Sequence, residues 1–320
     1  MDPSPEDIAL ELLPFVRVYK NGHIERLKGT EIVPPGLDPK TGIQSKDIEI
    51  LPEFSLSARL YIPKITNPSQ KFPLLIYFHG GGFIIESPFS PVYHNYLNSL
   101  VLEANVVAVS VEYRRAPEHV LPIAYDDSWA AVKWVESNFL NGGEEDWIKK
   151  YADCNKVFFA GDSAGGNITY HMAMRVGSGQ LPGMKLSGVV LAQPFFWGKD
   201  PIGCEREDPH TKEYVDGLWN FSYPGLADGC DDPAVNPEKD PNLGSFGCKN
   251  VLVCVAGKDI IRDRGWWFSE ILKKSGWVGN VDVMEAEGED HVFHLFNPSC
   301  ENAKDMLKRV SDFMNQEGKD

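Results

Sequence analysis

Hydrophobic residues along the chain fall into eight short runs, which we expect to be β-strands. The two runs that start at Lys46 and Ser55 alternate apolar and polar positions, as strands with one exposed face do. The six later runs are largely apolar, which is typical of strands buried on both faces. These runs are LLIYF from Leu74, NVVAVSVEY from Asn105, KVFFA from Lys156, SGVVLAQ from Ser187, NVLVCVA from Asn250 and NVDVMEA from Asn280.

Amphipathic patterns typical of helices separate or follow the later runs. Three of them begin at Asp126, Arg264 and Cys300 and extend to residues 140, 276 and 316. Two alternating strands followed by repeated strand–helix units predict an α/β fold. We expect a mostly parallel sheet of about eight strands with helices on both faces.

Two segments interrupt this order. Residues 1–40 precede the first strand, and residues 198–240 lie between two strands and are rich in Gly, Pro, Asp and Trp. Both are too long to be simple connections. We expect a single domain over residues 1–320, with both segments acting as cap elements over the edge where such sheets bind ligands. Surface insertion without function is the alternative.

The charge and composition of the chain exclude some classes of binding partner and bear on where the protein is located. A net charge of −15 argues against nucleic acid and against an anionic membrane surface. No apolar run reaches membrane-spanning length, and the acidic N-terminus lacks the basic segment of a secretory signal. The six cysteines form no C-x-x-C pair. We therefore expect a cytoplasmic protein with reduced thiols; no feature marks an oligomer interface.

The sequence GDSAG at residues 161–165 predicts a nucleophile. It lies between an expected strand and an expected helix, where G-x-S-x-G forms a tight, strained turn that lifts the serine hydroxyl above the sheet. The start of the helix would also stabilise negative charge developing there. Alone the motif is weak, but this context favours Ser163 as the nucleophile.

A serine hydroxyl needs a base held by a carboxylate, and this architecture places them in the chain order Ser, Asp, His. His291 comes first after the last expected strand, so we favour it over His294. The other downstream histidines are less suitable, because His171 lies two turns along the helix after Ser163 and His210 lies in the expected cap. For the acid we favour Asp259, which follows a strand directly; Asp263 is better placed to begin a helix.

The sequence HGGG at residues 79–82 predicts an oxyanion hole. Ordering consecutive glycines is entropically costly, so a close approach to the backbone must require them. We expect the amides of Gly81 and Gly82, together with that of Ala164, to stabilise the oxyanion formed when an ester carbonyl is attacked. His79 is expected to anchor this loop. A flexible loop is the alternative, which the later G-x-S-x-G disfavours.

Together, HGGGF, GDSAGGN, YRRAPEH and GEDHVFHL resemble the plant carboxylesterase family, in the hormone-sensitive-lipase branch of the α/β hydrolases. The resemblance covers nearly the whole chain. It implies an α/β-hydrolase fold, a triad of Ser163, Asp259 and His291, caps over the acyl and alcohol pockets, and no metal or organic cofactor.

Departures among relatives sharpen this expectation. Gibberellin receptors replace the triad histidine, 2-hydroxyisoflavanone dehydratases typically carry threonine as the nucleophile, and the related alkaloid cyclases lose one glycine and the histidine. This chain keeps Ser163, His291 and all three glycines. The leading hypothesis is therefore a serine carboxylesterase acting on a small-molecule ester through an acyl-enzyme, in plant specialised metabolism. An alkaloid methyl-ester hydrolase with decarboxylation, a dehydratase or lyase, and a gibberellin-receptor-like binding protein are the alternatives.

We expect the substrate pocket to be apolar and aromatic, which would suit a polyaromatic natural product. Packing alone could equally explain aromatic residues in caps. The candidates are Phe83, Ile84, Ile85, Phe196, Trp219 and Tyr223.

Overall fold

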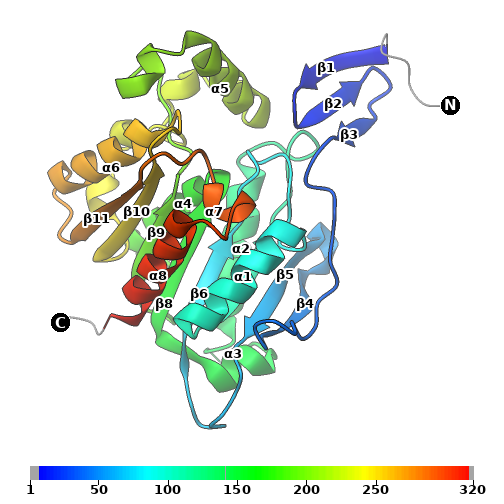
Figure 1. Cartoon of the computed structure of the whole chain (residues 1–320), viewed down its shortest axis with the longest axis vertical. Helices are drawn as coiled ribbons and strands as arrows, with labels where there is room; N and C mark the ends of the chain where they lie inside the picture. Colours follow the sequence, from blue (N-terminus) through cyan, green and yellow to red (C-terminus); the bar gives the residue numbers. More distant parts are fainter. Residues whose placement is uncertain (1–6, 141, 317–320) are drawn as a thin grey trace.

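The computed structural model describes residues 7–140 and 142–316. Its centre is an eight-stranded sheet in the order β11-β10-β9-β8-β6-β7-β5-β4 (Figure 1). Strand β5 pairs antiparallel with β4 and β7, and the remaining neighbours are parallel. All eight predicted strands are present: β4 (Gln44–Leu51), β5 (Leu56–Ile62), β6 (Phe72–Phe78), β7 (Val107–Glu112), β8 (Ala152–Asp162), β9 (Leu186–Ala192), β10 (Asn250–Ala256) and β11 (Asn280–Ala286).

Helices cover both faces of this sheet (Figure 1). Helices α1 (Pro91–Ala104) and α8 (Glu301–Asn315) pack on one face, with the short α7 (Phe293–Phe296) beside them. Helices α2 (Ile123–Ser137), α4 (Ala164–Gly177) and α6 (Arg262–Lys274) pack on the other, and the short α3 (Asp146–Tyr151) contributes Ile148 to the same core.

Strand β6 shows why the central runs are continuously apolar. Leu74, Ile76 and Phe78 belong to one core, whereas Leu75 and Tyr77 belong to the core on the opposite face. Successive side chains of a strand point to opposite faces. When helices cover both faces, every side chain of the strand is buried, and the whole run is therefore apolar.

The segment before the sheet forms a small sheet of its own. Strands β1 (Ile8–Leu12), β2 (Val16–Tyr19) and β3 (Ile24–Arg26) pair antiparallel. The first six residues of the expected 1–40 element lie outside the described part of the chain. The side chain of Arg26 donates hydrogen bonds to the carbonyls of Ile84 (2.7 Å) and Ala116 (3.0 Å), so β3 is tied to the segment after the HGGG motif.

The segment 198–240 contains helix α5 (Pro209–Ser222) and three short 3-10 helices, Gly203–Arg206, Gly229–Asp231 and Pro237–Lys239. In Figure 1 α5 and the β1–β3 sheet lie at the same end of the molecule. The rings of Phe15 and Tyr214 are 6.5 Å apart, so the two segments touch. Ser222, the last residue of α5, donates a hydrogen bond to the carbonyl of Gly82 at 3.0 Å. Both segments therefore contact the glycine loop or its continuation.

Candidate active site

Ser163 lies on a strained turn between β8 and α4. Its φ and ψ are 51° and −120°, in a region that a non-glycine residue adopts only when its surroundings enforce it. A Cβ atom on Gly165 would lie 2.0 Å from the carbonyl oxygen of Phe78, so glycine alone fits there. The close approach holds the first turn of α4 against the end of β6 and places Ser163 at the helix N-terminus.

Ser163, His291 and Asp259 form a hydrogen-bonded chain. The distance between His291 Nε2 and Ser163 Oγ is 2.9 Å, and that between His291 Nδ1 and Asp259 Oδ2 is 2.7 Å. The residues follow β8, β11 and β10, whose carboxyl ends meet at one edge of the sheet. A carboxylate only accepts, so Nδ1 carries the proton and Nε2 is free to accept one from the serine.

The electrostatics of His291 favour its protonated form. Burial lowers the pKa of His291, but the charges around it and its hydrogen bond to Asp259 together raise that pKa above its usual value, and Asp259 contributes most to the rise. The charges of Asp162 and Asp290 act in the same direction. Asp259 is itself 2% exposed and also accepts from the amide of Ile261 at 3.1 Å, which fixes its orientation.

The glycine loop follows β6 directly. Gly81 and Gly82 have φ values of +96° and +63°, and a Cβ on Gly81 would lie 2.2 Å from the carbonyl oxygen of Ile85. Across residues 7–140 and 142–316, the amides of Gly81, Gly82 and Ala164 have no acceptor. His79 is buried, stacks on Tyr113 at 4.3 Å and contacts the carbonyl of Gly80 through Nδ1. The loop is therefore rigidly held, and three N–H groups are left available.

The competing candidates take other positions. His294 is buried against Tyr96, and burial lowers its pKa to about 3. His171 contacts the carbonyl of Ala234 through Nε2 at 2.9 Å. Asp263 lies in the first turn of α6 and accepts from the amide of Cys204 at 2.7 Å. None of these three is hydrogen-bonded to Ser163 in the part of the chain that is described.

The expected pocket residues lie mostly in the core. Phe83, Ile84, Ile85, Phe196 and Trp219 are each no more than 6% exposed, and Tyr223 is partly buried. The ring of Phe83 packs edge-on against Trp219 at 6.3 Å, and Trp219 packs against Tyr223 at 5.7 Å. Phe196 packs instead against Phe268 at 4.9 Å. Their assignment to a substrate pocket stays a prediction.

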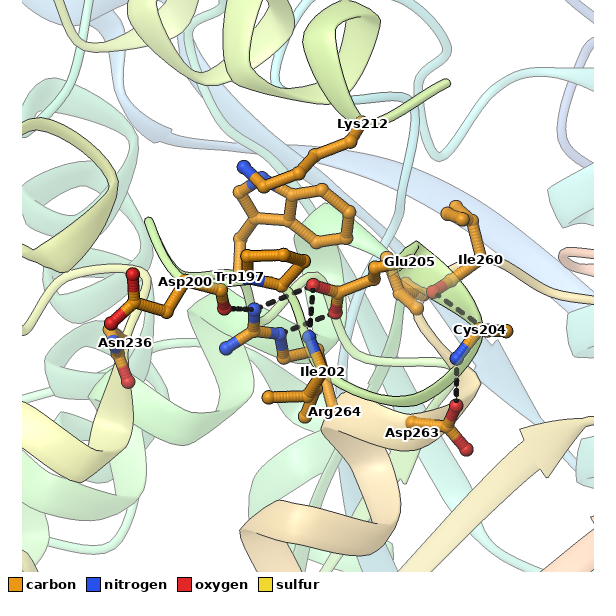
Figure 2. A network of polar contacts seen from close by, with 12 residues as sticks. Trp197, Asp200, Ile202, Cys204, Glu205, Lys212, Asn236, Ile260, Asp263 and Arg264 are labelled. Carbon is orange, nitrogen blue, oxygen red and sulfur yellow. Dashed lines mark hydrogen bonds and ion pairs between the residues drawn. The ribbon is translucent and has the colours of Figure 1, made fainter. Parts of the chain in front are cut away.

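A buried ion pair fastens the 198–240 segment to α6 (Figure 2). Arg264 donates to both carboxylate oxygens of Glu205 at 2.6 and 2.7 Å, and their side chains are 5% and 0% exposed. Arg264 and Lys212 of α5 also lie 5.5 and 5.4 Å from the centre of the Trp197 ring. The Trp197 Nε1–H group donates to Asp216 of α5 at 2.6 Å. Helix α5 is therefore linked to α6 through Trp197.

Breaking this pair should destabilise the protein. We expect Arg264→Met to lower the free energy of unfolding by about 3–5 kcal/mol, because Glu205 would keep a buried, unpaired charge. The double variant Glu205→Leu/Arg264→Met should lose much less of the free energy of unfolding, because no unpaired charge remains. The control Lys308→Met breaks an exposed pair with Asp312 and should change the free energy of unfolding by less than about 0.5 kcal/mol. Urea denaturation measures all three. Equal losses in the single and double variants would refute a charge-based explanation.

Sequence reasoning missed Asp162, the first of the two variable residues of GDSAG. Its side chain is fully buried and accepts hydrogen bonds from the hydroxyls of Tyr77 (2.7 Å) and Tyr93 (2.8 Å). Burial raises the pKa of Asp162 to about 6, while the two tyrosines oppose that rise. A carboxylate at the end of an apolar strand is unusual, so the sequence could have indicated that Asp162 has a specific role. No local sequence pattern indicates such a role for Tyr93.

Residues 75–295 match the model of a family described by its alpha/beta hydrolase fold. Probable carboxylesterase 2 from Arabidopsis thaliana is 48% identical over 318 residues, which cover 99% of each chain. The chain belongs to the plant carboxylesterase family of α/β hydrolases. This carboxylesterase-family protein is also 45% identical to a 2-hydroxyisoflavanone dehydratase from Glycyrrhiza echinata, over 97% of each chain. Among solved structures, an esterase from Pyrobaculum calidifontis has a TM-score of 0.70 and 26% identity, covering 85% of this chain and 84% of that one.

Three further observations concern membrane-spanning helices, metal-binding groups and cysteines in this family member. Within the described ranges, none of its helices has both the length and the apolar character that crossing a bilayer requires. The same residues contain no group of three or more His, Cys, Asp or Glu side chains arranged to hold a metal ion. All six cysteines are free thiols, and Cys254 is buried within β10, as its apolar sequence context indicated.

Proposed function

We propose that this protein is a serine carboxylesterase that cleaves a small-molecule ester through an acyl-enzyme on Ser163. Its membership of the carboxylesterase family supports carboxylic ester hydrolysis. The observation that carries the proposed mechanism is the chain Asp259–His291–Ser163, with distances of 2.7 and 2.9 Å. Such a chain turns an unreactive hydroxyl into a nucleophile.

Acylation begins when Ser163 Oγ attacks the ester carbonyl and passes its proton to His291 Nε2. The carbonyl electron pair moves to oxygen, and the amides of Gly81, Gly82 and Ala164 donate to that oxyanion. When the carbonyl re-forms, the bond to the alkoxy oxygen breaks, and His291 gives the proton to the departing alcohol. Asp259 holds the imidazole tautomer and stabilises its charged form.

Deacylation repeats these steps with water. His291 takes a proton from water, whose oxygen bonds to the acyl carbon. Collapse of the second oxyanion releases the acid and returns the proton to Ser163. We assign no cofactor to this sequence of steps, since each bond change is balanced by the three side chains and water.

We also propose that the β1–β3 sheet and segment 198–240 cap the site. Contacts of Arg26 with Ile84 and of Ser222 with Gly82 support this, because both join the segments to the oxyanion loop or its continuation. The aromatic residues Phe83, Trp219 and Tyr223 favour a planar aromatic substrate from plant specialised metabolism, an alkaloid ester among them. Competition by planar alkaloids or flavonoids against a p-nitrophenyl ester tests this; no inhibition would contradict it. Cytoplasmic location stays a prediction.

The proposed esterase activity is tested by measuring the hydrolysis of short p-nitrophenyl esters by the wild-type protein. We expect p-nitrophenol and the carboxylic acid in equal amounts. A dehydratase is the second candidate, favoured by the relative of that name. Parallel incubation with 2-hydroxyisoflavanone distinguishes them, since isoflavone formation without ester cleavage would overturn the proposal.

A further inference from the structure

The hydroxyl of Tyr93 joins the two loops that carry the oxyanion donors. It donates to Asp162 Oδ2 at 2.8 Å and accepts from the amide of Gly80 at 2.8 Å. Asp162 directly precedes Ser163, and Gly80 directly precedes Gly81. One buried hydroxyl on α1 therefore connects the residue before the nucleophile with the residue before the first loop donor.

Gly80 is shaped for this contact. A Cβ atom there would lie 2.4 Å from Asp162 Oδ2 and 2.9 Å from Tyr93 Oη. Its amide is occupied by Tyr93, so unlike the amides of Gly81 and Gly82 it is not available to an oxyanion. Gly80 therefore differs in function from Gly81 and Gly82. Because it has no side chain, the Asp162 carboxylate and the Tyr93 hydroxyl can approach its backbone.

We propose that Tyr93 is a positioning residue. Through its hydrogen bonds to Gly80 and Asp162 it fixes the distance and orientation between the glycine loop and the turn that carries Ser163. The inference rests on the proposed esterase function. The donors Gly81 and Gly82 lie on one loop and Ala164 on the other, and they can act on one oxygen only when the two loops are correctly spaced. Oxyanion donors must lie about 2.7–3.1 Å from the developing charge, so small displacements are costly.

Tyr77 supplies a matched control. Tyr77 and Tyr93 are both 2% exposed, and each donates one hydrogen bond to the Asp162 carboxylate. Tyr77→Phe and Tyr93→Phe therefore each remove one buried hydroxyl and one donor to Asp162. Of the two substitutions, Tyr93→Phe alone takes the acceptor from the Gly80 amide.

The test compares kcat and KM for p-nitrophenyl butyrate in both variants. We expect Tyr93→Phe to lower kcat about 10- to 100-fold with KM within about twofold, because a displaced donor acts on the transition state and not on the bound ester. Tyr77→Phe should keep kcat within about threefold. Equal loss in both variants, full kcat in Tyr93→Phe, or a loss confined to KM would each overturn the proposal.

Asp162 gives a second test should Tyr93→Phe fail to fold. Asp162→Asn keeps an acceptor for the Tyr93 hydroxyl, whereas the similarly sized Asp162→Leu removes it. The proposal expects a kcat about tenfold or more lower in the leucine variant, and equal values contradict it. Ser163→Ala separates the two claims: wild-type turnover there would refute the esterase, whereas an inactive Ser163→Ala beside an unaffected Tyr93→Phe refutes the positioning role alone.

Discussion

Ser163→Ala should abolish ester hydrolysis, with kcat falling on the order of 10⁶-fold. The substitution removes the oxygen that bonds to the acyl carbon. His291, 2.9 Å from that oxygen, is then left without the proton it is positioned to take. The available amides would still favour the transition state, so a small rate above that in water should persist.

Hydrolysis of p-nitrophenyl acetate by both proteins at equal concentration measures this loss. Ser178→Ala is the control, because Ser178 is an exposed residue at the far end of α4 and should leave the rate unchanged. A lyase that uses His291 as its base would tolerate Ser163→Ala, so near wild-type turnover by this variant would reject the acyl-enzyme mechanism.

Asp259→Asn should lower kcat about 10⁴-fold while leaving the fold intact. An amide can donate to Nδ1, which favours the tautomer with the proton on Nε2, where the base must be free. The variant also loses the charge that raises the pKa of His291, although Asp162 and Asp290 continue to raise it. Two separate effects follow, one on the rate and one on its pH dependence.

The direction of the pH effect follows from the required protonation state. Since the base must be neutral, kcat/KM falls as pH drops through the pKa of His291. In the wild-type protein that pKa is raised, so the acidic limb should lie above about 6.5, and in Asp259→Asn it should move to lower pH. A pH profile of kcat/KM measures both. Asp263→Asn is the control, and an acidic limb that stays in place in Asp259→Asn would contradict the assignment of the acid.

The sheet was predictable because burial on both faces leaves a simple pattern. Every strand from β6 to β10 lies between two helical layers, so its run is apolar whichever way each side chain points. Helices α2, α6 and α8 were predicted to within about three residues at each end. Helix α1 was not, although Tyr93, Leu97, Leu100, Val101 and Ala104 are buried at helical spacing, because polar residues separate them.

The segments outside the sheet were less predictable. Strands β1–β3 have three to five residues each, and the middle three residues of β1 are exposed although two of them, Ala9 and Leu10, are apolar, so its sequence does not mark a buried strand. Helix α5 packs on the glycine loop through Leu218 and Ser222, contacts that no local pattern encodes. The β1–β3 sheet and α5 lie at one end of the molecule, and this position depends on tertiary contacts such as that between Phe15 and Tyr214.

The candidate site divides in the same way. Ser163 and the glycine loop belong to local motifs whose backbone geometry demands glycine at fixed positions. Asp259 and His291 follow strands in a known chain order, and the structure brings both to Ser163. Tyr93 reaches Asp162 across 69 residues of sequence, which requires the first turn of α1 to lie beside the carboxyl ends of β6 and β8. Such a residue becomes visible only in three dimensions.

The central claim, that Ser163 is an activated nucleophile, is tested most directly by titration with diethyl p-nitrophenyl phosphate. Attack by Ser163 on phosphorus would release p-nitrophenolate and leave a diethylphosphoryl group that hydrolyses too slowly to turn over. We expect one p-nitrophenolate per chain, complete loss of esterase activity, and the adduct on the peptide that contains Ser163, with no reaction in Ser163→Ala. Esterase activity that survives the reagent, or an adduct on another residue, would contradict the account.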